Sequence, residues 1–162
     1  MNTVFLGLGS NIDAEENLRL GVRELSNRYG ELTLSPVYRS APLGFEGEDF
    51  LNMVVAMQTD RAAAAINDDI DEIHGLAGRE RSSDRFVSRP LDIDLLLYGD
   101  AEINEGKVRV PRSDILEYSF VLAPLADLAP ELKHPQTGKT MLEHWESFDP
   151  ASHPIELVDV IL

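Results

Sequence analysis

Apolar side chains recur along the first part of the chain in two alternating patterns. Four segments have the length and apolar content of β-strands: residues 3–8, 32–39, 50–57 and 91–98. Two segments between them repeat apolar residues every three or four positions, as amphipathic helices do: Leu18, Val22, Leu25 and Tyr29, then Ile66, Ile70, Ile73 and Ala77. The predicted order is strand, helix, strand, strand, helix, strand.

Local signals predict where the two helices begin and end. Asp13, followed three residues later by Glu16, is a capping-box signature, and Gly30 is typical of the position just after a helix. Asp60 is a candidate cap for the second helix. We therefore expect the first helix to lie between Asp13 and Gly30, and the second to begin soon after Asp60.

This order of elements predicts an α+β fold with the ferredoxin-like βαββαβ arrangement, in which helices pack on an antiparallel sheet. The 162 residues suit one hydrophobic core, and no repeat, linker or low-complexity segment interrupts them. We expect residues 1–162 to form a single domain.

The C-terminal part of the chain has a less regular pattern and is expected to be an extension of this fold. The elements predicted there are short strand pieces at 102–103 and 108–110, helices at 120–128 and 141–148, and a turn at 134–139. Residues 155–162 are apolar enough to form another strand or to contact a partner.

Charge and composition narrow the function classes. The net charge of −15, from 29 acidic and 14 basic residues, repels a phosphate backbone and argues against a nucleic-acid partner. The absence of cysteine excludes disulfides and thiolate metal sites. No apolar run has the length of a membrane span, and no leader pattern precedes the first strand, so we expect a cytoplasmic protein without a membrane partner.

Basic residues are concentrated in one segment. Four of the eleven arginines lie between residues 79 and 89: Arg79, Arg81, Arg85 and Arg89. Arginine binds phosphate oxygens in a bidentate manner, and the serines at 82, 83 and 88 would let this loop close over a nucleotide as a lid. The alternative is a solvated charged loop. The excess of arginine within a strongly acidic chain favours phosphate binding.

Asp92 and Asp94 form the second candidate site. Side chains two apart on a strand point to the same face, so these carboxylates stand side by side near the strand's end. Two neighbouring anions repel each other, and Mg²⁺ binds one or two carboxylates together with substrate phosphates. The alternative is a pair neutralised by Arg85 and Arg89.

An amide and two aromatic residues suggest a second binding surface. Asn52 interrupts an apolar strand, and a buried amide requires hydrogen-bond partners. It could bind the polar edge of a heterocycle held between Phe50 and Phe120. Taken alone, Asn52 would be interpreted as a structural amide with its hydrogen bonds satisfied, and the two phenylalanines as core residues.

The chain does not match two other patterns that are typical of nucleotide-binding or RNA-binding proteins. Gly7-Leu8-Gly9 matches only the start of a dinucleotide-binding fingerprint, because Ile12 stands where the third glycine would be. The RNA-recognition module shares the βαββαβ order, but it needs a basic surface that this chain lacks.

Several of these segments resemble, in the same order, the motifs of the 6-hydroxymethyl-7,8-dihydropterin pyrophosphokinase family of folate biosynthesis. The resemblance covers about residues 3–143. The matching segments are Gly9-Ser10-Asn11, 38–44, Phe50-Leu51-Asn52, 78–81, 89–94, 97–99, Val110-Pro111 and 120–125.

The resemblance implies that diphosphate is transferred from ATP to the hydroxymethyl group of the pterin and that AMP is released. It implies two Mg²⁺ ions on Asp92 and Asp94, and catalytic roles for Arg79 and Arg89. It assigns the pterin to Ser40, Ala41, Pro42, Leu43, Phe50, Asn52 and Phe120. It assigns the nucleotide to His74, Arg81, Arg85, Arg109 and Arg112.

The chain departs from the family pattern near the expected nucleotide. Phe86-Val87-Ser88 stands where the family usually has Trp-Gly-Pro. His74 replaces a glutamate, Arg112 replaces a histidine, and Tyr118 replaces an arginine. The sequence therefore also allows a diverged paralogue that binds pterin or nucleotide without efficient transfer.

Overall fold

The computed structural model describes residues 1–78 and 90–162. Within these ranges the helices are α1 (Ala14–Tyr29), α2 (Ala63–Leu76), α3 (Asp114–Glu117), α4 (Ser119–Leu128) and α5 (Met141–Ser147), with a 3₁₀ turn η1 at Pro150–Ser152. The strands are β1 (Asn2–Ser10), β2 (Thr33–Leu34), β3 (Val37–Ser40), β4 (Phe50–Thr59), β5 (Asp92–Tyr98), β6 (Ile103–Glu105), β7 (Val108–Val110) and β8 (Ile155–Val158).

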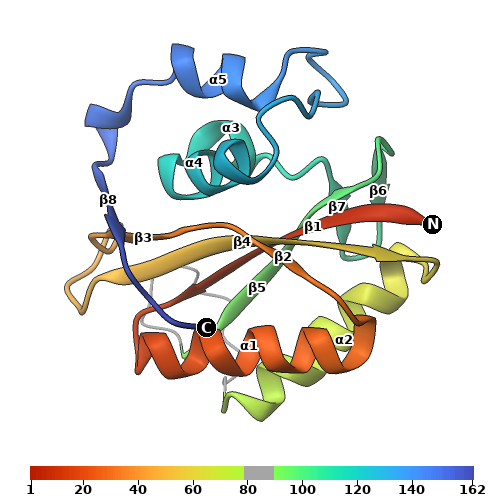
Figure 1. Cartoon of the computed structure of the whole chain (residues 1–162), viewed down its shortest axis with the longest axis horizontal. Coiled ribbons are helices and arrows are strands. Elements are labelled where there is room, and N and C mark those ends of the chain that lie inside the picture. Colours follow the sequence, from red (N-terminus) through yellow and green to blue (C-terminus); the bar gives the residue numbers. More distant parts are fainter. Residues whose placement is uncertain (79–89) are drawn as a thin grey trace.

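The central sheet is antiparallel and has the strand order β5-β1-β4-β3-β8, with the short β2 also paired to β4. Helices α1 and α2 cover one face of this sheet, and α3, α4 and α5 lie over the other (Figure 1). The predicted ferredoxin-like arrangement is confirmed, since β1, α1, β3, β4, α2 and β5 follow the predicted order. No helix of the described ranges is long and apolar enough to cross a membrane.

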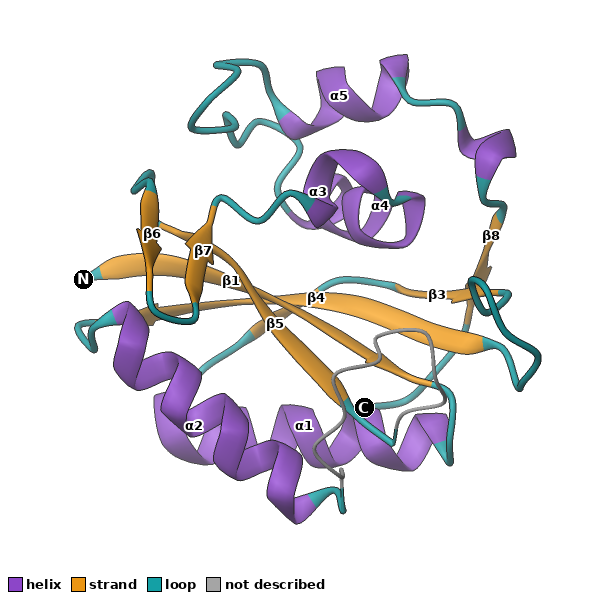
Figure 2. Cartoon of the chain, turned by 180° about the vertical axis from the view of Figure 1, so that it is seen from behind, coloured by secondary structure: helices purple, strands orange, loops and turns teal. Residues whose placement is uncertain are grey.

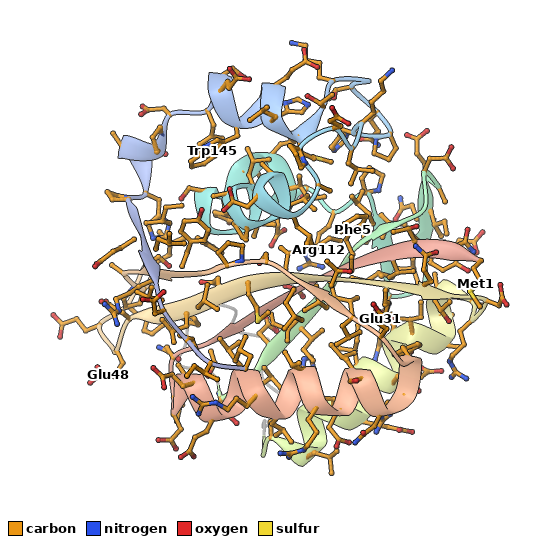
Figure 3. All side chains as sticks on the ribbon, viewed as in Figure 1. Met1, Phe5, Glu31, Glu48, Arg112 and Trp145 are labelled. Atoms are coloured by element: carbon orange, nitrogen blue, oxygen red, sulfur yellow. The ribbon has the colours of Figure 1, made fainter. Side chains whose placement is uncertain are left out.

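Strand alternation sends apolar side chains to both faces of the sheet, because both faces are covered. In β1, Leu6 and Leu8 are buried in a core shared with α1 and α2. Phe5 points the other way, into a second core shared with α4 and α5. Figure 3 shows Phe5 and Arg112 between the sheet and the α4 layer. Burying a leucine contributes about 1.5–3 kcal/mol, so both layers stabilise the sheet.

The strand predicted at 32–39 is two strands, β2 and β3, because the chain leaves the ladder at Ser35 and Pro36. Proline has no backbone N–H to donate. The Ser35 hydroxyl oxygen accepts a hydrogen bond from the Val54 N–H at 2.8 Å, and the Ser35 N–H donates to the Val54 carbonyl oxygen at 2.9 Å. The Ser35 hydroxyl oxygen thus takes the place of a backbone carbonyl oxygen as the acceptor for the Val54 N–H.

Asp13 and Gly30 flank α1, as predicted, but the capping bonds predicted for the Asp13 and Asp60 side chains do not form. Asp13 precedes α1 but has a left-handed backbone (φ 45°) and makes no side-chain capping bond, because such a bond normally needs an extended backbone. The residue before α2 is Ala62, and the Asp60 carboxylate instead pairs with the N-terminal amine at 3.4 Å. A capping box does occur at α5, between Thr140 and Glu143.

The C-terminal extension wraps around one edge of the sheet. The predicted helices correspond to α4 and α5, and the short strand pieces to the β6–β7 hairpin. The predicted turn is closed by a bridge between Lys133 and Thr140. The tail forms β8, which pairs with β3 (Figure 1), and the Arg19 Nε then donates to the Ile161 carbonyl oxygen at 2.7 Å. The tail therefore joins the α5 layer to α1.

Candidate active site

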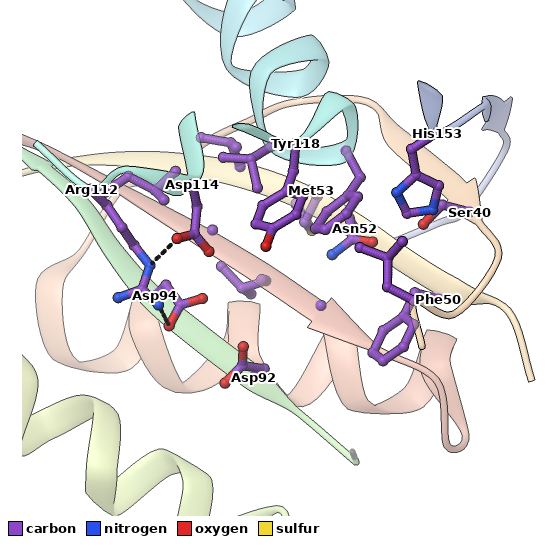
Figure 4. A pocket seen from close by; sticks show the side chains of 18 of the residues that line it. Ser40, Phe50, Asn52, Met53, Asp92, Asp94, Arg112, Asp114, Tyr118 and His153 are labelled. Atoms are coloured by element: carbon purple, nitrogen blue, oxygen red, sulfur yellow. Dashed lines mark ion pairs between the residues drawn. The ribbon is translucent and has the colours of Figure 1, made fainter. Parts of the chain in front are cut away.

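A pocket lies between the α4-facing side of the sheet and the helices above it. Its floor comes from β1, β4 and β5, and its roof from α3, α4 and a histidine of the C-terminal segment (Figure 4). The chain between β3 and β4 supplies one wall. Figure 2 shows β5, β1 and β4 crossing beneath α3 and α4, where this floor and roof face each other. The pocket thus collects residues from distant parts of the sequence.

The strand register brings the predicted metal ligands and the predicted amide into one pocket. Gly9 of β1 lies opposite Asn52 of β4 on one side and opposite Asp92 of β5 on the other. Gly7 lies opposite Asp94. Because side chains alternate along a strand, all of these positions face the pocket. Asp92 and Asp94 stand on the same face of β5, as the spacing predicts.

Gly7 and Gly9 of β1 have no side chains, so the strand backbone forms this part of the pocket floor. A β-carbon at Gly9 would lie 2.5 Å from Nδ2 of Asn52, so any side chain there would displace the amide. A β-carbon at Gly7 would meet Leu96 at 3.4 Å. Gly9 therefore allows the close approach of Asn52, whereas the contact at Gly7 would be an ordinary one. Both glycines lie within β1 and not in a dinucleotide-binding turn.

The residues that follow Gly9 fix the two ends of the pocket. The Ser10 hydroxyl donates a hydrogen bond to the Pro90 carbonyl oxygen, just before β5. The Asn11 amide donates to the Glu48 carbonyl oxygen at 3.1 Å, in the chain between β3 and β4. Both side chains are buried. Gly9-Ser10-Asn11 thus positions the carboxylate strand and the opposite wall relative to β1.

Charge gathers at the β5 end of the pocket. The Arg112 guanidinium lies 3.5 Å from the Asp94 carboxylate and 3.4 Å from the Asp114 carboxylate (Figure 4). Burial, together with the negative charge of Asp92, raises the pKa of Asp94 to about 7, although Arg112 partly opposes both effects. A cation bound between the two carboxylates would relieve the repulsion that Asp94 experiences from Asp92.

Asp92 and Asp94 are the residues that could hold such a cation. Within residues 1–78 and 90–162, no cluster of three or more histidine, cysteine or acidic side chains has the geometry of a complete metal site. Two carboxylates without a third protein ligand suit Mg²⁺, which usually completes its octahedral shell with water and substrate phosphates. The donor set fits this ion.

The other end of the pocket is aromatic and carries an unsatisfied amide. Phe50 meets the edge of Phe45, with ring centroids 6.2 Å apart, and Phe120 stacks on Tyr118 at 5.1 Å. The Oδ1 atom of Asn52 is buried and accepts no hydrogen bond from any described residue. A buried acceptor without a donor costs free energy, and a ligand that donates a hydrogen bond to Asn52 would recover that free energy.

The structure brings most of the predicted pterin residues together. Those that line the pocket are Ser40, Ala41, Leu43, Phe50, Asn52 and Phe120, whereas Pro42 does not line it. Asp114, Tyr118 and His153 also line the pocket, although no sequence pattern predicted them as site residues. Only Tyr118 had a sequence signal, as a departure from the family pattern.

The predicted nucleotide residues are spread more widely. Arg112 lines the pocket, but His74 and Arg109 do not. His74, in α2, accepts a hydrogen bond at Nε2 from the Ile93 N–H at 2.9 Å, and Arg109 donates to the Gly106 and Val108 carbonyl oxygens of its own hairpin. The remaining predicted residues, and the predicted lid, lie outside the described residues: Arg79, Arg81, Arg85, Arg89 and 82–88.

Known proteins with the same pattern cover most of the chain. The sequence profile of the 7,8-dihydro-6-hydroxymethylpterin-pyrophosphokinase (HPPK) family matches residues 5–130. A 2-amino-4-hydroxy-6-hydroxymethyldihydropteridine pyrophosphokinase of Methylorubrum extorquens is 34% identical over 155 residues, which cover 93% of this chain and 96% of the relative. The enzyme of the same name from Porphyromonas gingivalis is 36% identical over 142 residues, with 84% and 96% covered.

Solved structures agree at the level of the fold. The HPPK-DHPS of Plasmodium falciparum with pterin and p-hydroxybenzoate superimposes with a TM-score of 0.74 at 14% identity. The match covers 90% of this chain and 42% of that longer chain, so this chain spans less than half of it. The profile match and the identities to relatives of similar length place the chain, as its motifs predicted, in the 7,8-dihydro-6-hydroxymethylpterin-pyrophosphokinase family.

Proposed function

We propose that this chain transfers a diphosphate group from ATP to 6-hydroxymethyl-7,8-dihydropterin and releases AMP, as a step of folate biosynthesis. The observation that supports this most is the sharing of one pocket by Asp92, Asp94 and Asn52, on strands that flank β1. A pair of carboxylates suits a metal-bound polyphosphate, and a buried amide between aromatic rings suits a flat heterocycle. The pocket joins both requirements.

The proposed reaction is an in-line displacement. The hydroxymethyl oxygen of the pterin forms a bond to the β-phosphorus of ATP, and the bond from that phosphorus to the α–β bridging oxygen breaks. AMP leaves with the electron pair of the broken bond, and the hydroxyl proton passes to solvent. Because such transfers depend mainly on positioning and charge neutralisation, the protein's task is to align two substrates in one pocket.

Asp92 and Asp94 are the proposed ligands of Mg²⁺, with two ions expected from the family resemblance. When bound, Mg²⁺ supplies positive charge to the phosphate oxygens and to the developing charge of the leaving group. Arg112 and Asp114 orient Asp94 from α3 and the segment before it, since Arg112 contacts both carboxylates. Arg112 therefore acts on the nucleotide end of the pocket through Asp94, and also supplies positive charge there.

The pterin is proposed to lie at the aromatic end. Phe50 and Phe120 line this end and would contact the faces of the ring. The Asn52 side chain faces the same space (Figure 4). Ser40, Ala41 and Leu43 line the wall that would face its edge. This arrangement puts the ring beside the metal-binding carboxylates, as an attack by its hydroxymethyl group requires.

The roles of the four arginines between residues 79 and 89 stay predictions from the sequence. His74 is more consistent with a positioning role, because it holds the backbone of Ile93 between the two aspartates. A supporting effect on the metal site would then replace the nucleotide contact predicted for it.

Product analysis tests the proposal. The protein is incubated with ATP, MgCl₂ and 6-hydroxymethyl-7,8-dihydropterin, and nucleotides and pterins are separated by chromatography. The expected products are AMP and the pterin diphosphate in equal amounts. Release of ADP would contradict diphosphate transfer. Tight pterin binding, measured by calorimetry, without AMP formation would instead support the alternative of a diverged binding protein.

A further inference from the structure

His153 reaches the pocket from the C-terminal segment, residues 149–158, which lies beyond residues 5–130, the part of the chain that the family's sequence profile matches. Three contacts hold it in place. The Ser119 hydroxyl donates to the His153 carbonyl oxygen at 2.6 Å, and β8 begins two residues later, with Ile155 opposite Ser40 in β3. The imidazole ring meets the edge of Phe120, with ring centroids 5.2 Å apart. The ring is therefore held beside the proposed pterin position.

The hydrogen bond to the pocket wall fixes which nitrogen of His153 carries the proton. Nε2 lies 3.0 Å from the Ala41 carbonyl oxygen, and a carbonyl oxygen can only accept. Nε2 is therefore the donor. In the neutral ring, Nδ1 then carries a lone pair and is an acceptor.

Nδ1 of His153 is buried and has no hydrogen-bond partner among the described residues. Oδ1 of Asn52, a residue that lines the same pocket, is likewise buried and has no hydrogen-bond partner among the described residues. Figure 4 shows both side chains directed into this space from opposite elements, β4 and the C-terminal segment. Two buried acceptors without donors among the described residues cost free energy, and a ligand that brings N–H groups would recover this free energy.

The pyrimidine ring of a pterin carries such groups side by side, the ring N3–H and the exocyclic 2-amino group. We propose that His153 is a substrate-binding residue whose Nδ1 accepts a hydrogen bond from the N–H edge of the pterin, while its Nε2 holds the Ala41 wall in place. This inference rests on the proposed function. It extends the pterin site beyond residues 5–130, which the family's sequence profile matches.

Two substitutions separate the two nitrogens of His153. In His153→Asn the side-chain oxygen can take the place of Nδ1, but nothing reaches Ala41. In His153→Gln the terminal amide can take the place of Nε2 and keep the bond to Ala41, but the acceptor at Nδ1 is lost. His153→Phe keeps the ring against Phe120 and removes both nitrogens.

Equilibrium titration with 6-hydroxymethyl-7,8-dihydropterin is the readout, together with KM and kcat. His153→Gln and His153→Phe are expected to weaken pterin binding by ~10-fold or more and to raise KM for the pterin, because an N–H of the ligand loses its acceptor. His153→Asn is expected to stay within ~3-fold of the native protein. The Kd for an ATP analogue with Mg²⁺ should change in none of them.

His144→Gln is the matched control, because His144 lies in α5 and contacts Thr137 and His134, away from the pocket. The reverse order, with His153→Gln like the native protein and His153→Asn impaired, would overturn the inference and make His153 a structural support of Ala41. Equal affinity in all variants would also overturn it. Failure of the native protein to bind the pterin would instead overturn the proposed function.

Discussion

Gly9 and Asn52 lie opposite each other in the ladder between β1 and β4, and the Asn52 amide occupies the space that a β-carbon at position 9 would need. The distance from that β-carbon to Nδ2 would be 2.5 Å, well inside van der Waals contact. The orientation of the amide therefore depends on the absence of a side chain on the neighbouring strand. This relationship links the Gly-Ser-Asn motif directly to the amide that is proposed to bind the heterocycle.

The first prediction concerns this contact. Gly9→Ala is expected to push the Asn52 amide out of place and to raise the Kd for the pterin by about 10-fold or more, since the buried acceptor loses its alignment. The Kd for an ATP analogue with Mg²⁺ should change much less. Calorimetric titration of both ligands measures the difference.

Gly75→Ala is the control, because Gly75 lies in α2 and a β-carbon there would meet nothing within 4 Å. It should leave pterin binding unchanged and stabilise the helix by about 0.5–1 kcal/mol. Native pterin affinity in Gly9→Ala would show that the amide orientation does not depend on this glycine.

The second prediction uses the raised pKa of Asp94. Its pKa is about 7 in the folded protein, against an ordinary value of 3.8, so between these values the folded state binds the proton more tightly. The stabilising contribution of this group is present below about pH 4 and is lost as the pH rises through 7. Without Mg²⁺, Asp94→Asn should therefore exceed the native protein in unfolding free energy by roughly 2–4 kcal/mol at pH 8.

Urea unfolding at pH 5 and pH 8, without and with Mg²⁺ and ATP, measures this difference. The advantage of Asp94→Asn should shrink at pH 5, and it should also shrink when the ligands stabilise the native protein. Turnover of the variant should fall by about 10²-fold or more. Asp68→Asn, an exposed change in α2, is the control for the charge alone. Near-native turnover in Asp94→Asn would contradict the role of Asp94 as a metal ligand.

The third prediction concerns His74, whose Nε2 accepts the backbone N–H of Ile93. Ile93 lies between the two aspartates and points to the opposite face of β5. His74→Leu should leave this N–H without its acceptor, lower the unfolding free energy by about 1–3 kcal/mol and weaken Mg²⁺–ATP binding. His74→Gln offers an oxygen to the same N–H and should recover most of both losses.

Amide hydrogen exchange at Ile93 provides the direct readout, with faster exchange expected in His74→Leu and protection restored in His74→Gln. If His74 contacted the nucleotide instead, His74→Leu would weaken ATP binding while exchange at Ile93 stayed at the native rate. That result would support the contact between His74 and the nucleotide that the sequence predicts.

The fold of the first part of the chain could be predicted because its signals are local. Period-2 and period-3.6 patterns identified the strands and the first two helices, and the two-residue spacing of Asp92 and Asp94 placed both on one face. Asp13 does precede α1, but the capping bonds predicted for Asp13 and Asp60 do not form, because such a bond depends on the backbone conformation at one position. A residue pattern does not specify that conformation.

Other parts of the site depend on contacts between distant segments. Asp114 belongs to a helix of four residues, too short to show any periodicity, and the sequence gives no sign that it approaches Arg112 and Asp94. His153 enters the pocket only because the tail pairs with β3 at the far edge of the sheet. The role of Gly9 likewise depends on the register between β1 and β4. Patterns along one chain carry no information on such pairings.

Isotope tracing in a single turnover distinguishes the transfer of an intact diphosphate from the transfer of a single phosphate. Excess protein is mixed with Mg²⁺, 6-hydroxymethyl-7,8-dihydropterin and ATP labelled either at the α- or at the γ-phosphorus. We expect all γ-label to appear in the pterin product and all α-label to appear in AMP, at equal rates. Asp92→Asn and Asp94→Asn are expected to slow the appearance of both labels. Recovery of γ-label as free phosphate, or of α-label in ADP, would contradict the account.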